Sequence, residues 1–217
     1  MHVHYQHRFV LMQRVQDAVI DGYDRYQQIA CSPEKAAQLA RQFAARYETE
    51  ISKQSRWRRK RSGLACAKFL SLREAALTEV HALLMVTSEG AGSVQSEPLH
   101  DPAKRRIQLW GYELVHDGVG WSWHYTADSM KQWRTRIHKA IAVDNQVQLL
   151  TIVRSLFRSA GFRLVRKQVG ELINYLRGEW RRLRKGELPA LPTFLPYIKR
   201  LPDDWLPVPR ATGMEQP

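Results

Sequence analysis

The chain has 217 residues, 44% hydrophobic and 25% charged, a composition that allows a buried core and excludes a disordered chain. Its 34 Lys and Arg against 21 Asp and Glu give a net charge of +13, which points to a polyanionic partner, nucleic acid first and an anionic membrane surface or acidic protein second. Two cysteines exclude a disulfide framework and a Cys-rich zinc site. Because the sequence shows no signal peptide and no apolar run of membrane-spanning length, we expect a cytoplasmic protein without a membrane partner.

Two helices are expected in the N-terminal part. Residues 9 to 29 have apolar positions at helical spacing, although Gly22 is a weak point. A second helix should begin after Ser32, because Ser is a good N-cap and Pro33 suits the first helical position. This helix can run on into the basic stretch that follows, with Gly63 as its stop.

The pattern then becomes that of strands. Residues 80 to 87, VHALLMVT, are predicted to form a short strand. The segments RRIQLWGYELV and VGWSWHYT flank HDG and are predicted to form a β-hairpin, with a bulge at Gly111. In the second arm Trp121, Trp123 and Tyr125 alternate with smaller or polar residues, which indicates a half-buried strand.

The C-terminal part is expected to be helical up to a proline-rich tail. Thr126 and Asp144 are suitable N-caps for two helices, and a long amphipathic helix should cover residues 165 to 185. The Leu-Pro repeats that follow predict an extended segment, packed on the body through its aromatic residues.

The fold class predicted from these elements is α+β. It has a helical N-terminal part, a small antiparallel sheet of about three strands, C-terminal helices and the extended tail. We expect one nucleic-acid-binding domain over residues 1–186 and the tail over residues 187–217, with the last residues loose.

The strongest functional feature is the segment SKQSRWRRKRSGLACAKF, residues 52 to 69, which holds seven basic residues and no acid. A solvated helix end, the alternative, normally mixes charge signs. Arginine favours bidentate phosphate contacts. Trp57 could stack on a base or anchor the helix end. The candidate nucleic-acid-binding residues are Lys53, Arg56, Trp57, Arg58, Arg59, Lys60 and Arg61.

A second basic region lies in the long helix. Residues 154 to 185 hold ten Lys and Arg against two Glu. At about 100° per residue, four arginines fall on one flank of the apolar face. They form either a second phosphate-binding surface or a solvated face. These residues are Arg166, Arg177, Arg181 and Arg184.

Other signals support weaker alternatives. The aromatic face of the hairpin could stack unpaired bases, although a sheet face covered by helices is the more ordinary interpretation. A metal-independent ribonuclease would need a histidine as general acid or base, and His81, His116 and His124 are available. We expect no cofactor and no metal site, and a protein that binds nucleic acid without being an enzyme.

Two resemblances bear on function. His2-Val3-His4 is similar to the His-hydrophobic-His motif of rolling-circle replication initiators and relaxases, which implies a metal-dependent tyrosine nickase. In that family the motif lies on an inner strand with another strand before it, and here nothing precedes it, so a frayed terminus is expected. The candidate tyrosines are Tyr23, Tyr26 and Tyr175.

Residues 30 to 130, with the basic segment followed by GYELV and GWSWHYT, resemble uncharacterised accessory proteins of plasmids and integrating conjugative elements in proteobacteria. This resemblance implies a mobile genetic element and transfers no site residues. We therefore predict a nucleic-acid-binding protein, for DNA or RNA, within a larger nucleoprotein complex that contains other protein subunits. The alternatives are a nickase or RNA-processing nuclease, and an interaction subunit that docks a partner through its Pro-rich tail.

Overall fold

A computed structural model describes residues 3–74 and 78–207, and it divides the chain into two compact units. Unit 1 comprises Met1–Arg105 and Arg200–Pro217, and unit 2 comprises Arg106–Lys199. The fold is α+β, as predicted, but the expected single antiparallel sheet of about three strands is wrong, because the described residues form a five-stranded sheet with one parallel pair and a separate three-stranded sheet. The expected boundary at residue 186 does not coincide with this division, because residues 187–199 belong to unit 2 and residues 200–207 to unit 1.

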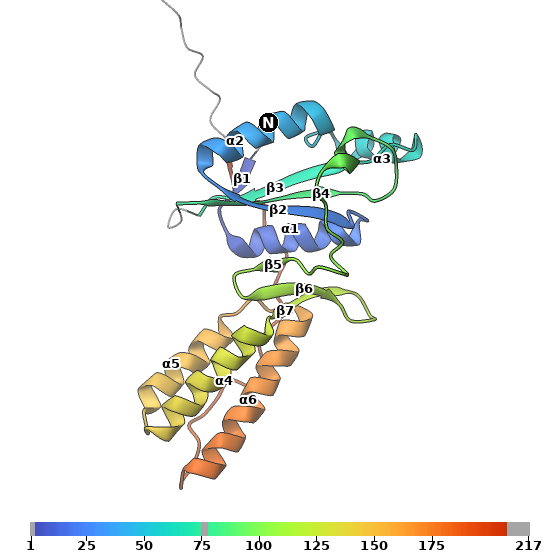
Figure 1. The fold of residues 1–217 in the computed structure, drawn as a ribbon. Helices are drawn as coiled ribbons and strands as arrows, with labels where there is room; N and C mark the ends of the chain where they lie inside the picture. The colour runs from blue at the N-terminus through green and yellow to red at the C-terminus, as the bar shows by residue number, and fades with distance from the viewer. Residues whose placement is uncertain (1–2, 75–77, 208–217) are drawn as a thin grey trace, which may run out of the picture. The chain divides into compact units, whose positions relative to one another are not determined.

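Unit 1 contains a five-stranded sheet of order β2-β4-β3-β1-β8 (Figure 1). The β1–β3 pair is parallel and is joined through Tyr5 and Leu72, whereas the β1–β8, β2–β4 and β3–β4 pairs are antiparallel. The expected strand at residues 80 to 87 is confirmed, and four further strands accompany it. The strands are β1 (Val3–Tyr5), β2 (Arg25–Cys31), β3 (Ala67–Leu72), β4 (Val80–Val86) and β8 (Trp205–Pro207).

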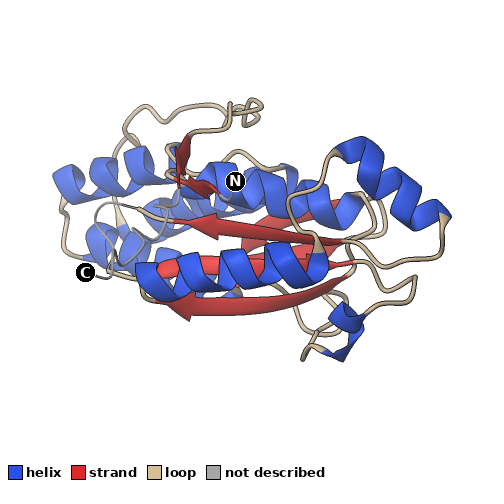
Figure 2. Cartoon of the chain, turned by 90° about the horizontal axis from the view of Figure 1, so that it is seen from above, coloured by secondary structure: helices blue, strands red, loops and turns tan. Residues whose placement is uncertain are grey.

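Two helices cover the two faces of this sheet, α2 (Pro33–Tyr47) on one and α1 (Arg8–Ile20) on the other (Figures 1 and 2). On the α2 side, Phe43 packs edge-on against Phe69 of β3, with ring centroids 5.4 Å apart. Leu72 lies on the opposite face of β3 because successive side chains alternate, and it is fully buried, as is Leu11 of α1. The core of unit 1 therefore has two layers, one on each side of the sheet.

The prediction of a first helix over residues 9 to 29 is wrong for the second half of that range. Helix α1 ends at Ile20, and Gly22 adopts a left-handed φ of +86°. Residues 25–31 instead form β2, which pairs antiparallel with β4 over its whole length. A long-range strand pair has thus overridden a helical spacing of apolar residues.

The second expected helix is interrupted before the basic segment. As predicted, Ser32 caps α2 and Pro33 stands in its first turn. The helix ends at Tyr47, however, and Glu48 takes a left-handed φ of 54°. The basic residues form a separate helix, α3 (Lys53–Arg61), followed by Gly63 with a φ of +71°.

Unit 2 combines the predicted hairpin with three helices. Helix α4 is capped by Thr126 as predicted, whereas Asn145, and not Asp144, caps α5. Trp110 and Gly111 have φ values of 48° and 80°, so Gly111 belongs to a two-residue hairpin turn and the expected bulge is wrong. The elements are β5 (Gln108–Leu109), β6 (Tyr112–His116), β7 (Trp121–Tyr125), α4 (Ala127–Ala142), α5 (Gln146–Phe157) and α6 (Arg163–Leu183).

The proline-rich segment is extended and bonded to the folded units. In unit 2 the Ile198 amide donates to the Gly161 carbonyl at 3.1 Å. In unit 1 Arg14 donates to the Leu201 carbonyl at 2.7 Å, and the Leu201 amide donates to Gln13 at 3.0 Å. The expectation of loose final residues falls on residues 208–217, which lie outside the described residues.

Candidate nucleic-acid interface

Helix α3 is built almost entirely from polar residues. Ser52 caps it, and its hydroxyl accepts from the Ser55 amide at 3.1 Å. Lys and Arg have high helix propensity, but no residue of the helix is buried, so apolar packing does not hold it in place. Its position must depend on the polar contacts of its side chains.

Two of the candidate arginines supply these contacts. Arg56 donates to the Thr49 carbonyl at 2.7 Å, and Arg59 donates to the Ala65 carbonyl at 3.3 Å. Arg59 also forms an ion pair with Glu48. These guanidinium groups bind the chain immediately before and after α3. Arg56 and Arg59 therefore fix the helix, and they have fewer donors left for a phosphate.

A second anchor lies around the buried ring of Tyr23. Lys60 and Lys68 stand over this ring, with their Nζ atoms 5.1 and 4.3 Å from its centroid. Lys60 also donates to the Asp21 carbonyl at 3.0 Å, and Lys68 pairs with the Asp21 carboxylate at 3.3 Å. Burial, together with the charges of Arg56 and Lys60, lowers the pKa of Lys68, while burial raises the pKa of Tyr23 to about 12. The inner side of α3 is thus held through Lys60, which is itself exposed but contacts the Tyr23 ring and the Asp21 carbonyl.

The outer face of α3, defined as Lys53, Trp57, Arg58 and Arg61, is exposed to solvent. Trp57 is 59% exposed, and the Arg61 guanidinium lies over its ring at 5.3 Å. Within the described residues, none of the three cations forms an ion pair. This face presents three positive charges beside an accessible aromatic ring.

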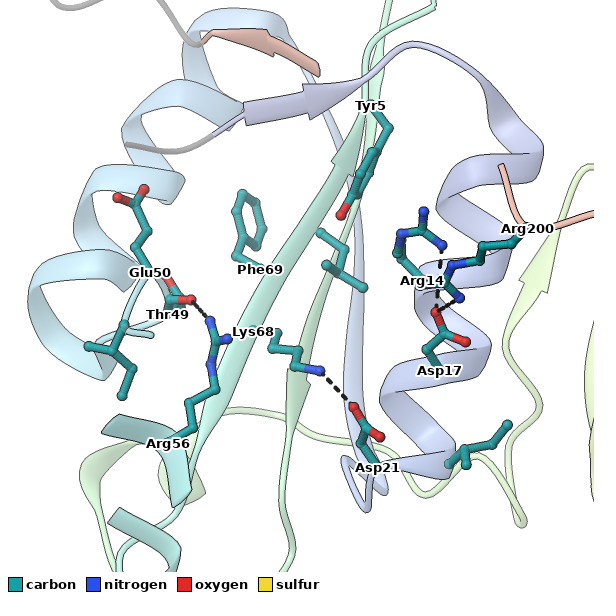
Figure 3. A pocket seen from close by; sticks show the side chains of 13 residues that line it. Tyr5, Arg14, Asp17, Asp21, Thr49, Glu50, Arg56, Lys68, Phe69 and Arg200 are labelled. Carbon is teal, nitrogen blue, oxygen red and sulfur yellow. Dashed lines mark hydrogen bonds and ion pairs between the residues drawn. The ribbon is translucent and has the colours of Figure 1, made fainter. Parts of the chain in front are cut away.

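A pocket of about 660 Å³ opens beside α3, between α1, β3 and residues 49–56 (Figure 3). Its cations are largely neutralised by its own carboxylates. Arg14 and Arg200 both bind Asp17, and Lys68 binds Asp21 (Figure 3). The pocket therefore attracts a phosphate less strongly than the outer face of α3 does.

Three candidate arginines lie in α6 and the fourth, Arg184, follows its last residue; they divide in a similar way into bonded and exposed side chains. Arg166 donates to the Leu195 carbonyl at 2.6 Å. Arg184 donates through Nε to the Ile141 carbonyl at 2.7 Å, at the C-terminus of α4. Arg177 and Arg181 are exposed. The structure thus gives Arg166 and Arg184 carbonyl partners in other segments. Arg177 and Arg181 lie on the surface, where Nε of Arg181 donates to the Arg177 carbonyl of the same helix at 3.4 Å.

The aromatic hairpin belongs to the core of unit 2. Trp123 is fully buried and Tyr125 is 5% exposed, so the alternative of a base-stacking platform is wrong. His124 is half-buried, with Nε2 2.7 Å from the Glu113 carboxylate. His116 accepts from the Gly118 amide at 3.2 Å in the hairpin turn. These histidine contacts are those of structural residues.

The N-terminal motif is only partly described, because His2 lies outside the described residues. Contrary to the expected frayed terminus, Val3–Tyr5 forms β1, an inner strand between β3 and β8. His4 is 1% exposed, and its Nδ1 lies 2.8 Å from the Ser71 hydroxyl. Burial lowers the pKa of His4 to about 4, and Arg73 contributes. Among residues 3–74 and 78–207, no three His, Cys, Asp or Glu side chains are grouped as metal ligands.

The sequence does not predict that the Phe194 side chain is exposed. The proline-rich segment was expected to pack on the body through its aromatic residues, yet Phe194 is 66% exposed. A single aromatic residue among prolines carries no periodicity, so nothing in the sequence indicates the direction in which its ring points.

Comparison with protein-family models, curated proteins and solved structures found no match to the chain. Within the part of the chain that the structure describes, no helix is both long and apolar enough to cross a membrane.

Proposed function

We propose that this chain binds nucleic acid through the outer face of α3 and acts within a nucleoprotein complex of a mobile genetic element. The observation that carries the proposal is the division of the basic helix into two sides. Arg56 and Arg59 hold the helix, while Lys53, Arg58 and Arg61 are exposed and form no ion pair with the residues that the structure describes. Cations of this kind attract phosphates by counterion release.

The anchoring of α3 strengthens the proposal on energetic grounds. A flexible basic tail loses conformational entropy when it binds, whereas a helix that is already fixed at both ends loses less. Glu48 and the carbonyls of Thr49 and Ala65 fix this helix before any ligand arrives. The outer face is therefore preorganised for a phosphate backbone.

Trp57 adds a contact of a different kind. An exposed indole can stack on a base, and such stacking contributes about 1–3 kcal/mol per base without sequence preference. The Arg61 guanidinium above the ring can pair with the adjacent phosphate. Phosphate contacts of this type give affinity and not sequence choice, which suits a subunit that works inside a larger assembly.

The tail-docking alternative receives less support. Leu201 and Ile198 of the Pro-rich segment already bond to other parts of the same chain. Deleting residues 187–217 would remove these internal contacts together with any partner site. Such a deletion would test folding as much as binding.

The proposal is tested by fluorescence anisotropy with labelled single- and double-stranded DNA and RNA of equal length. At about 50 mM salt we expect saturable binding, which should weaken steeply as salt is raised towards 200 mM. The proposal is overturned if the folded protein binds none of the four probes at low salt.

A further inference from the structure

Unit 2 contains a groove of about 440 Å³ between α6 and the proline-rich segment. Val169 and Ile173 of α6 form its buried floor. Lys167 and Arg177 also line it from α6, and residues 193–195 line it from the proline-rich segment. One wall of the groove is therefore a helix, and the other is an extended segment without regular secondary structure.

The charge of the groove is one-sided. Four basic residues line it and no acidic residue does. Arg163 is neutralised by Asp117, whose carboxylate lies 2.6 Å from Nη1. Arg166, Lys167 and Arg177 have no carboxylate partner within the part of the chain that the structure describes. Three positive charges therefore line a partly apolar groove.

The second wall is fixed, so the groove exists before a ligand binds. A Cβ atom at Gly161 would lie 2.0 Å from the Pro196 carbonyl oxygen, which shows how closely the segment approaches the body. The Arg166 guanidinium donates to the Leu195 carbonyl at 2.6 Å and stacks 3.5 Å from the centre of the Tyr197 ring. These contacts fix residues 195–197, the part of the chain that directly follows Phe194.

Phe194 and Gly170 open the groove to a flat ligand. Phe194 is 66% exposed although its neighbour Leu195 is buried. Glycine inside a helix costs about 1 kcal/mol relative to alanine. A Cβ atom at Gly170 would meet no atom within 4 Å, so packing within the chain does not require a glycine there. The missing side chain leaves room beside Lys167 and Phe194.

We propose that this groove binds a short single-stranded segment of nucleic acid, with phosphates at Lys167 and Arg177 and a base stacked on Phe194. The inference rests on the proposed function in taking nucleic acid as the ligand, and it adds the strand class. Bases in a duplex are stacked on one another, so only an unpaired base offers its face to an aromatic side chain. An acidic peptide would satisfy the cations but would leave the ring without a stacking partner.

The test uses the full chain and two matched variants. The groove variant is Lys167→Gln with Arg177→Gln, and the control variant is Lys131→Gln with Arg134→Gln on the exposed side of α4. Each removes one Lys and one Arg. The probes are a single-stranded oligonucleotide, a blunt duplex of the same length and a poly-glutamate peptide.

Each phosphate contact contributes about 0.7 to the slope of log affinity against log salt for a single strand. The groove variant removes two such contacts, so we expect it to lower this slope by about 1.4. The control variant should keep the slope. Phe194→Ser should weaken the single strand on the order of tenfold and leave the duplex unchanged. The groove inference is overturned if the two charge variants behave alike on the single strand, or if poly-glutamate alone is sensitive to the groove variant. The proposed function is tested separately, by whether the wild-type protein binds any of the nucleic-acid probes.

Discussion

Removing the three exposed charges of α3 should reduce the number of phosphate contacts without unfolding the helix. The variant is Lys53→Gln, Arg58→Gln and Arg61→Gln. Glutamine has nearly the same helix propensity as Lys and Arg. All three side chains are exposed, so we expect the free energy of unfolding to change by no more than about 0.5 kcal/mol.

The size of the expected change in salt dependence follows from these three cations, which form no ion pair in the described part of the chain. Each phosphate contact contributes about 0.9 to the slope of log affinity against log salt for duplex DNA and about 0.7 for a single strand. If Lys53, Arg58 and Arg61 each contact a phosphate, the variant should lower the slope by about 2.7 or about 2.1 respectively. A change close to zero would mean that the outer face of α3 does not meet the phosphate backbone.

A control with the same net charge separates local contact from long-range attraction. Lys35, Arg41 and Arg46 are exposed on α2, and their replacement by Gln also removes three charges. The assay is anisotropy titration over a salt series, with thermal melting to verify folding. Equal slopes for the α3 and α2 variants would refute the reasoning, because net charge alone would then explain the binding.

Three further predictions concern single residues. Trp57→Leu should weaken single strands on the order of tenfold and spare duplexes; equal losses for both in anisotropy titrations would contradict base stacking. Gly161→Ala should destabilise unit 2 by about 1–3 kcal/mol, because its Cβ would lie 2.0 Å from the Pro196 oxygen; an unchanged denaturation midpoint would contradict that packing. His4 has a folded pKa of about 4, below its unfolded value of 6.5, so the unfolded state takes up the proton first. Stability should therefore fall by up to about 3 kcal/mol as pH drops from 6.5 to 4, and urea denaturation of His4→Asn should show a weaker pH dependence.

The sequence predicted elements best where the signal is local. The caps at Ser32 and Thr126 are confirmed, as are the strand at residues 80 to 87 and the long helix that became α6. Strand β2 was missed because its sequence, RYQQIAC, has no strong alternation, and its conformation depends on pairing with β4. Such a partner is distant in sequence, so local spacing favoured a helix.

For the candidate site, too, the sequence predicts local features and not long-range contacts. Its charge is visible in the sequence, and the cluster of residues 53–61 needs no structure to be found. The division into an anchoring side and an exposed side depends on the carbonyls of Thr49 and Ala65, which no charge pattern reveals. Similarly, Phe194 points outwards because Leu195 and Gly161 fix the segment around it. These contacts are tertiary and cannot be inferred from residue spacing.

The central claim is that the outer face of α3 lies against nucleic acid. Ultraviolet crosslinking of the bound complex, followed by mass spectrometry of the digested protein, tests it most directly. The account predicts nucleotide adducts within Lys53–Arg61, with Trp57 the most reactive position because its ring is exposed beside Arg61. A complex whose adducts fall entirely outside this helix would contradict the account.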